Sequence, residues 1–117
     1  MNVHLDLTRR ENVIDFYHWW NAGGAGVIPD DSGMTVLRDE SGEHLNVIGR
    51  VWVSMELGAQ PFRALMYVVR NYCVPVALGN TFMEAHRAHV NMAHMTVQFM
   101  NKQPIPMFRS GDPGSRA

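Results

Sequence analysis

The chain has 117 residues, a formal net charge of −1 with neutral histidines, 46% hydrophobic residues and 18% charged residues. This length is enough for one hydrophobic core without a metal or disulfide, and the composition is that of a folded domain. The 10 Lys and Arg residues are scattered, which excludes the basic stripe of a duplex-binding protein. No apolar run approaches the roughly 18 residues of a membrane span, and the single cysteine excludes an internal disulfide. We therefore expect a soluble cytoplasmic domain over residues 1–109, followed by a tail over residues 110–117.

The N-terminal part of the sequence has the pattern of a helix. The run "TRRE", Thr8–Glu11, matches a capping box, in which Thr and Glu satisfy free amides at a helix start. Apolar residues then recur at helical spacing, and the glycines of "NAGGAG" favour a helix end. These features predict a first helix over about residues 9–21. The apolar positions are Val13, Phe16, Tyr17 and Trp20.

The next segment has the pattern of a β-hairpin. "MTVLRD" and "LNVIGRVWVSME" flank "DESGE", where Gly42 suits a tight turn. The second segment alternates in polarity and is predicted as a long strand, with a mainly apolar face on its odd-numbered residues. Gly49 inside it indicates a bulge or a close backbone approach.

The second half of the chain is predicted to hold two more helices. Pro61 suits the first position of a helix that continues to about Asn71. "CVPVAL" is a short apolar run with the composition of a strand, and Gly79 turns the chain after it. A second capping box, Thr81–Glu84, then opens a third helix.

Three of the six histidines fall within nine positions of this third helix. At 100° per residue His86 and His89 lie toward its apolar face, whereas His94 lies roughly 140° from His89. A metal site built from all three therefore has poor geometry, although His86 and His89 could supply two ligands with a third from elsewhere, such as His4, His18 or His44. The other interpretation is two partly buried histidines with ordinary hydrogen-bond partners.

The order of these elements, with "FYHWWNAGGAGVIPDDSGMTVL" and "VPVALGNTFMEAHRAHVNMAHMTVQFMN", resembles the GNAT family of acyl-CoA-dependent N-acyltransferases. In particular it resembles the short acetyltransferase-like proteins of tailed bacteriophages. The resemblance implies an α+β fold, a small mixed sheet with about three helices in the order α-β-β-α-β-α-(β-β). It also implies that the last helix stops near Asn91 and that a terminal hairpin forms around "NKQ".

The resemblance implies a site for acetyl-CoA at the loop "MELGAQPFRA" and at Asn80. A helix N-terminus with glycines before it binds phosphates through its backbone amides. Glu56 would be the general base of acyl transfer, and His86 or His89 the acid that protonates the thiolate. The residues expected to bind the cofactor are Met55, Leu57, Gly58, Ala59, Gln60 and Asn80.

Three departures from the family pattern bear on function. Pro61 removes an amide donor from the phosphate loop, Glu56 adds a charge of the wrong sign, and a tyrosine on the last helix is absent. We therefore expect a non-catalytic or catalytically degenerate phage protein, acting in the virion or on a host protein. The alternatives are an active N-acetyltransferase acting on an amine or protein lysine, and a small histidine-based metal-binding domain. The nine methionines favour a protein partner or self-association.

Overall fold

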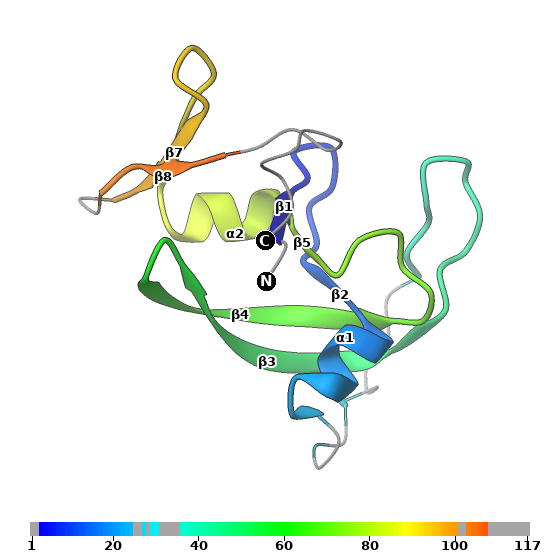
Figure 1. The fold of residues 1–117 in the computed structure, drawn as a ribbon. Helices are drawn as coiled ribbons and strands as arrows, with labels where there is room; N and C mark the ends of the chain where they lie inside the picture. The colour runs from blue at the N-terminus through cyan, green and yellow to red at the C-terminus, as the bar shows by residue number, and fades with distance from the viewer. Residues whose placement is uncertain (1–2, 25–26, 28, 31–35, 101–102, 108–117) are drawn as a thin grey trace.

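The computed structural model describes residues 3–24, 27, 29–30, 36–100 and 103–107. These residues form two β-sheets and two short helices (Figure 1). The elements are β1 (Val3–Leu5), β2 (Val13–Asp15), α1 (Phe16–Asn21), β3 (Val47–Leu57), β4 (Gln60–Val69), β5 (Val76–Leu78), α2 (Asn80–Ala85), β6 (Ala88–Asn91), β7 (Thr96–Phe99) and β8 (Ile105–Pro106).

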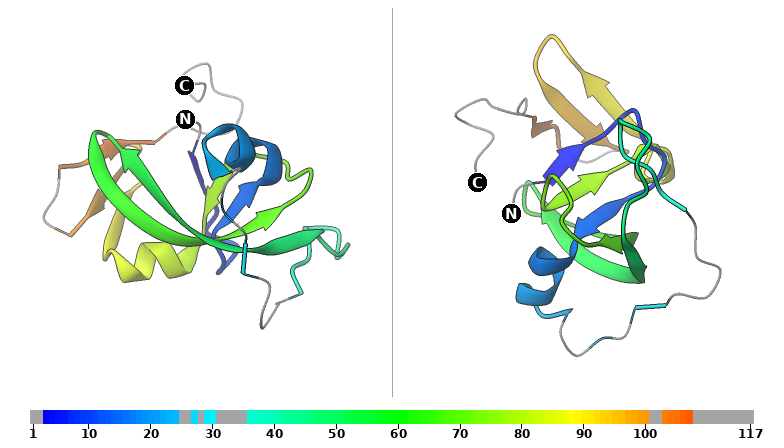
Figure 2. Two further views of the ribbon diagram at one scale, coloured as in Figure 1. Left: turned by 90° about the horizontal axis from the view of Figure 1, so that it is seen from below. Right: turned by 90° about the vertical axis from the view of Figure 1, so that its right-hand side faces the viewer.

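The larger sheet has the strand order β1-β5-β2-β4-β3. Strand β5 lies between β1 and β2, parallel to β1 and antiparallel to β2, while β2 runs parallel to the end of β4. Strands β3 and β4 form a long antiparallel hairpin that curves beneath the rest of the molecule (Figures 1 and 2). The smaller sheet, β6-β7-β8, is antiparallel throughout.

One hydrophobic core joins the two sheets and α2. The rings of Phe62 on β4, Phe82 on α2 and Phe99 on β7 meet with centroid separations of 4.9–5.7 Å. All three side chains are buried, and Phe99 is completely so. The smaller sheet is therefore held to the larger one by aromatic packing.

The predicted fold class is wrong, because the described residues are mostly β. The segment from Pro61 to Asn71 is not a helix but includes most of strand β4. Phe62, Ala64, Met66 and Val68 are buried at every second residue, and the turn before them has left-handed backbone at Gly58 and Ala59. Such a two-residue turn matches the twist of a hairpin. The spacing of Phe62, Leu65, Met66 and Val69 also fits a helix, so the apolar pattern alone could not separate the two.

The two other predicted helices are much shorter than expected. Instead of a helix over residues 9–21, β2 is followed by α1, which Asp15 caps. Helix α2 ends at Ala85, and its N-cap is Gly79 without a side-chain hydrogen bond. Neither predicted capping box forms, because both threonines are engaged elsewhere: Thr8 with Asp6 and Thr81 with the carbonyl of Arg10.

Several strand predictions are confirmed. The long strand is β3, and its ladder shifts register between Val47 and Gly49. A Cβ on Gly49 would lie 2.7 Å from Pro29 Cβ, so this glycine also permits a close approach. Strand β5, the turn at Gly42 and the pairing of β7 with β8 are likewise as predicted. The tail assigned to residues 110–117 lies outside the described residues.

Phe99 tests how strongly the smaller sheet is held. Phe99→Ala should lower the free energy of unfolding by about 3–5 kcal/mol, because it removes a buried ring and leaves a cavity. Met100→Ala is the matched control, since the neighbouring side chain is 54% exposed. Urea unfolding followed by circular dichroism would measure both, and equal effects would contradict the role of Phe99.

Candidate functional site: the loop pair at Asp6

The ends of two neighbouring parallel strands define the candidate site. Leu5 of β1 pairs with Leu78 of β5, so both strands end side by side. The chain continues from β1 into the loop Asp6–Asn12 and from β5 into residues 79–81 at the start of α2. The amide of Asp6 donates to the carbonyl of Leu78 at 2.9 Å. We call these two segments the loop pair.

Hydrogen bonds join the two halves of the loop pair. The amide of Asn80 donates to Arg9 O at 2.8 Å, and the amide of Thr81 donates to Arg10 O at 3.0 Å. The Thr81 hydroxyl donates to the same carbonyl at 2.6 Å, and Asn80 Nδ2 donates to Leu7 O at 2.9 Å. The loop that carries Asp6 is thus held along its length by the strand–helix junction beside it.

Asn12 and Gly79 make this close contact possible. Asn12 is buried; its Oδ1 accepts from the amide of Gly79 at 2.9 Å and its Nδ2 donates to Leu65 O at 3.2 Å. A Cβ on Gly79 would lie only 2.4 Å from Glu11 O. Only glycine therefore allows the two backbones to approach this closely.

The two oxygens of the Asp6 carboxylate have different partners. Oδ1 accepts from the amide of Thr8 at 3.0 Å and from its hydroxyl at 2.6 Å, which fixes the carboxylate orientation. Oδ2 forms a long ion pair with Arg9 Nε at 3.9 Å, a separation beyond that of a hydrogen bond. The side chain is 30% exposed, so the carboxylate is partly accessible from solvent.

Arg9 links the loop pair to two other segments. Its Nη2 donates to Arg38 O at 2.6 Å, on the short hairpin around Gly42, and its Nη1 lies 3.4 Å from Glu11. Burial raises the pKa of Tyr72 above its usual value, and the nearby Arg9 guanidinium partly offsets this. Arg9 therefore lies where three segments meet beside Asp6.

Several other carboxylates of the described residues have structural roles. Asp15 caps α1 and accepts from the amide of Tyr72, while Asp30 pairs with Arg50. Asp39 closes its own turn by accepting from Ser41, and this bond lowers the pKa of Asp39. Asp6 differs from these groups in its position, because it follows the end of β1 where this strand lies beside β5.

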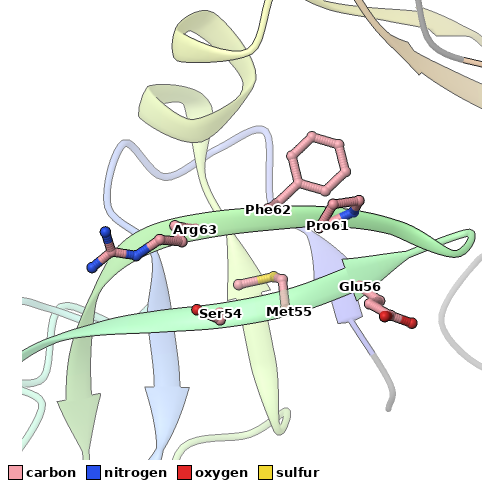
Figure 3. Close-up of a pocket in the computed structure, with 6 residues that line it drawn as sticks. All are labelled: Ser54, Met55, Glu56, Pro61, Phe62 and Arg63. Atoms are coloured by element: carbon pink, nitrogen blue, oxygen red, sulfur yellow. The ribbon is translucent and has the colours of Figure 1, made fainter.

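The predicted catalytic residues lie away from the loop pair. Glu56 is exposed near the end of β3 and points away from the core in Figure 3. His86 is the C-cap of α2 and packs against aromatic rings. The centroid of its ring lies 4.4 Å from that of Phe82 and 5.1 Å from that of Phe62. His89 is exposed on β6. Their proposed acid and base roles are not tested by the structure and stay predictions.

The residues predicted to bind acetyl-CoA lie mostly on the β3–β4 hairpin. Met55 and Leu57 belong to β3, Gly58 and Ala59 form the turn, and Gln60 begins β4. No helix follows this turn, so the phosphate-binding helix N-terminus assumed in the prediction is absent there. Binding of acetyl-CoA itself is untested and stays a prediction. Asn80 lies elsewhere, in the loop pair.

The hairpin has an open hollow of about 500 Å³ (Figure 3). Phe62 points from it toward α2, whereas Glu56 points outward. The hollow includes two of the predicted residues, Met55 and Glu56, but none from the loop pair. Its lining residues are Ser54, Met55, Glu56, Pro61, Phe62 and Arg63.

The alternative of a histidine-based metal site gains no support. Over the described ranges no group of three or more His, Cys, Asp or Glu side chains is placed to hold a metal ion. Helix α2 ends before His89, so the helical geometry that aligned His86 with His89 does not exist.

Within the described ranges, neither helix combines the length and hydropathy needed to cross a bilayer.

Sequence reasoning missed Asp6. The three-residue strand before it, "VHL", is too short to be recognised by alternation, and the following "TRRE" matches a helix cap. The available signal was an acidic residue directly after Leu5 and two residues before Thr8. That signal is common and becomes informative only when β5 is known to lie beside β1.

No protein-family model matches the sequence, and no curated protein matches it. Among solved structures, the chain is similar to the retroviral protease-like domain of Ddi1 from Leishmania major. The TM-score is 0.75 at 13% sequence identity, over 94% of this chain and 86% of that chain. This similarity shows the fold, which is that of a retroviral protease-like domain.

The expected kinship with GNAT acyltransferases is therefore wrong. The structural comparison and the predominance of β-structure both contradict it. The functions based on that kinship, a degenerate phage virion or host-interaction protein and an active N-acetyltransferase, are withdrawn with it. The resemblance depended on the order of helices, and all three were misassigned or predicted much too long.

Asn12 tests the rigidity of the loop pair. Asn12→Ala should lower the free energy of unfolding by about 2–3 kcal/mol, because it leaves the buried Gly79 amide unpaired. Asn80→Ala removes an exposed hydrogen bond between the same loops and should cost about 1 kcal/mol or less. Chemical denaturation would compare them, and a larger effect at Asn80 would contradict the interpretation.

Asp39 provides a test of the short hairpin around Gly42. Its pKa is lowered from 3.8, first by the Ser41 hydroxyl, so its contribution to stability is present above the unfolded pKa and lost as pH falls through the folded pKa. Ser41→Ala should raise the pKa of Asp39 toward 3.8. Carboxyl chemical shifts followed by NMR titration would measure this change. An unaltered titration of Asp39 would show that the hydroxyl is not the cause.

Proposed function

We propose that this protein is an aspartic peptidase in which two copies of the chain each supply Asp6. The observation that carries the proposal is the oriented, partly open Asp6 carboxylate on the loop pair of a retroviral protease-like fold. Aspartic peptidases use two carboxyl groups that share one proton. Asp6 supplies one carboxyl group of such a pair, and the Asp6 of a second copy of the chain supplies the other.

The chemistry follows from the shared proton. The ionised carboxylate removes a proton from water as the water oxygen attacks the carbonyl carbon of a peptide bond. The protonated carboxyl donates its proton to the carbonyl oxygen, giving a tetrahedral diol. Collapse of the diol breaks the C–N bond, with a proton passing to the leaving amine. No metal or cofactor enters these steps.

Two structural features support Asp6 in this role. The Thr8 amide and hydroxyl both donate to Oδ1, which fixes the orientation of the carboxylate. The hydrogen bonds from Asn80 and Thr81 hold the loop backbone, and such support is what a catalytic carboxylate needs for accurate placement. The expected cytoplasmic location belongs to the proposal too, since the exposed free thiol of Cys73 suits a reducing compartment.

Asp6→Asn is the direct test. The change preserves shape and hydrogen-bond acceptance but removes the ionisable group, so it should reduce cleavage of an unfolded polypeptide by about 10²- to 10⁴-fold. Cleavage would be followed by mass spectrometry of the products across acidic to neutral pH. The wild-type rate should pass through a maximum, because one carboxyl must be ionised and one protonated.

Asp39→Asn is the matched control, since Asp39 lies in an exposed turn and should leave the cleavage rate unchanged. Circular dichroism would confirm that both variants fold. Absence of cleavage by the wild-type protein at every pH would overturn the proposal. Full activity of Asp6→Asn would overturn it as well.

A further inference from the structure

The outer edge of β3 is a second candidate surface for binding a partner. This strand ends the larger sheet, at the opposite edge from β1. Tyr67 on β4 lies opposite Arg50. The amide of Tyr67 points away from β3 and donates to Asn12 O. Arg50 likewise directs both its amide and its carbonyl away from β4, to Asp30.

The same orientation repeats along the strand. In an antiparallel ladder every second residue directs its amide and carbonyl to the same side. Trp52, Ser54 and Glu56 therefore direct theirs outward, and among the described residues Asp30 covers the position of Arg50. Pro61 on β4 lies opposite Glu56 and agrees with this pattern. An N–H at this position would point away from β3, so the β3–β4 ladder loses no hydrogen bond by having a proline there. Among the described residues, no strand pairs with the outer edge of β3 from Ser54 to Glu56.

The side chains beside this edge are exposed and have complementary charges. Trp52 is 62% exposed, and the guanidinium of Arg63 lies 5.0 Å from the centre of its ring. Ser54, opposite Arg63 on the neighbouring strand, is small and exposed. Within the described part of the chain, neither Arg63 nor Glu56 forms an ion pair.

We propose that this edge pairs antiparallel with the same edge of a second copy of the chain, about a two-fold axis at Met55. Ser54 of each copy then lies opposite Glu56 of the other, and each such pair exchanges both backbone hydrogen bonds. Arg63 lies one strand further, in the same row, about 10 Å across the sheet from Glu56 of the second copy. The long side chains span this separation over the small Ser54, which gives two ion pairs related by symmetry.

This contact is separate from the site at Asp6. Strand β1, which leads to Asp6, is at the other edge of the sheet, as Figure 1 shows. A chain that uses both edges can therefore assemble beyond a dimer. The β3 contact depends on backbone pairing and charge, and it holds whether or not Asp6 is catalytic.

Charge reversal with mixing provides the experiment. Glu56→Arg places arginine against Arg63 of the second copy, and Arg63→Glu places glutamate against Glu56, so each variant alone should associate at least about tenfold more weakly than wild type. An equimolar mixture restores both opposite-charge pairs and should recover association. Sedimentation velocity over a range of concentrations would measure all three samples, with circular dichroism to confirm folding. The Asp6→Asn background isolates this contact from peptidase activity.

Ser54→Pro is the second variant. It removes an outward N–H that the β3–β4 ladder does not use, so it should leave folding intact and weaken association. Three results would overturn the proposal: charge variants that associate like wild type, a mixture no stronger than its components, or Ser54→Pro without effect on assembly. Loss of cleavage in Asp6→Asn with unchanged assembly would support both proposals separately.

Discussion

The contact between the loop Asp6–Asn12 and residues 79–81 is the constraint on which the rest of the structure depends. Strand β5 enters the sheet between β1 and β2, so the connection from β1 to β2 must pass across the end of β5. That crossing brings polar backbone groups into a buried place, where an unpaired amide is costly. Asn12 pairs with the Gly79 amide, and the absence of a side chain on Gly79 lets the loops touch. The same contact holds the loop that carries Asp6.

The two edges of the larger sheet, β1 and β3, present different chemical groups. At β1, the loop pair presents a partly exposed carboxylate that Thr8 orients, and the proposed peptidase chemistry needs a second such group. At β3, a long strand presents backbone groups and opposite charges, which we assign to the proposed pairing with a second copy. Both proposals require a second copy of the chain.

The fold could be predicted from sequence only where local patterns had one interpretation. The alternation in β3, the glycine at its bulge and the short apolar run of β5 were sufficient for correct strand assignments. The failure at Pro61–Asn71 has a physical cause, because apolar residues spaced by two, three and four satisfy both a strand and a helix. The predicted capping box at Thr8–Glu11 was wrong for a similar reason. A threonine that can cap a helix can equally bind the carboxylate two residues before it. The candidate site depends on this hydrogen bond between Thr8 and Asp6, and the sequence analysis therefore did not find it.

The sequence alone determined the broad physical character of this protein: a core-forming chain of near-neutral charge, with one long strand after a turn at Gly42. These properties depend on residue types and on spacing over a few positions. Only the tertiary structure decided that Gln60–Val69 pairs with that strand, that α2 is short, and that Asp6 meets the start of α2. Each of these depends on residues far apart in the chain, such as Asn12 and Gly79. Their hydrogen bond has no counterpart in any local pattern, since it exists only once β5 lies between β1 and β2.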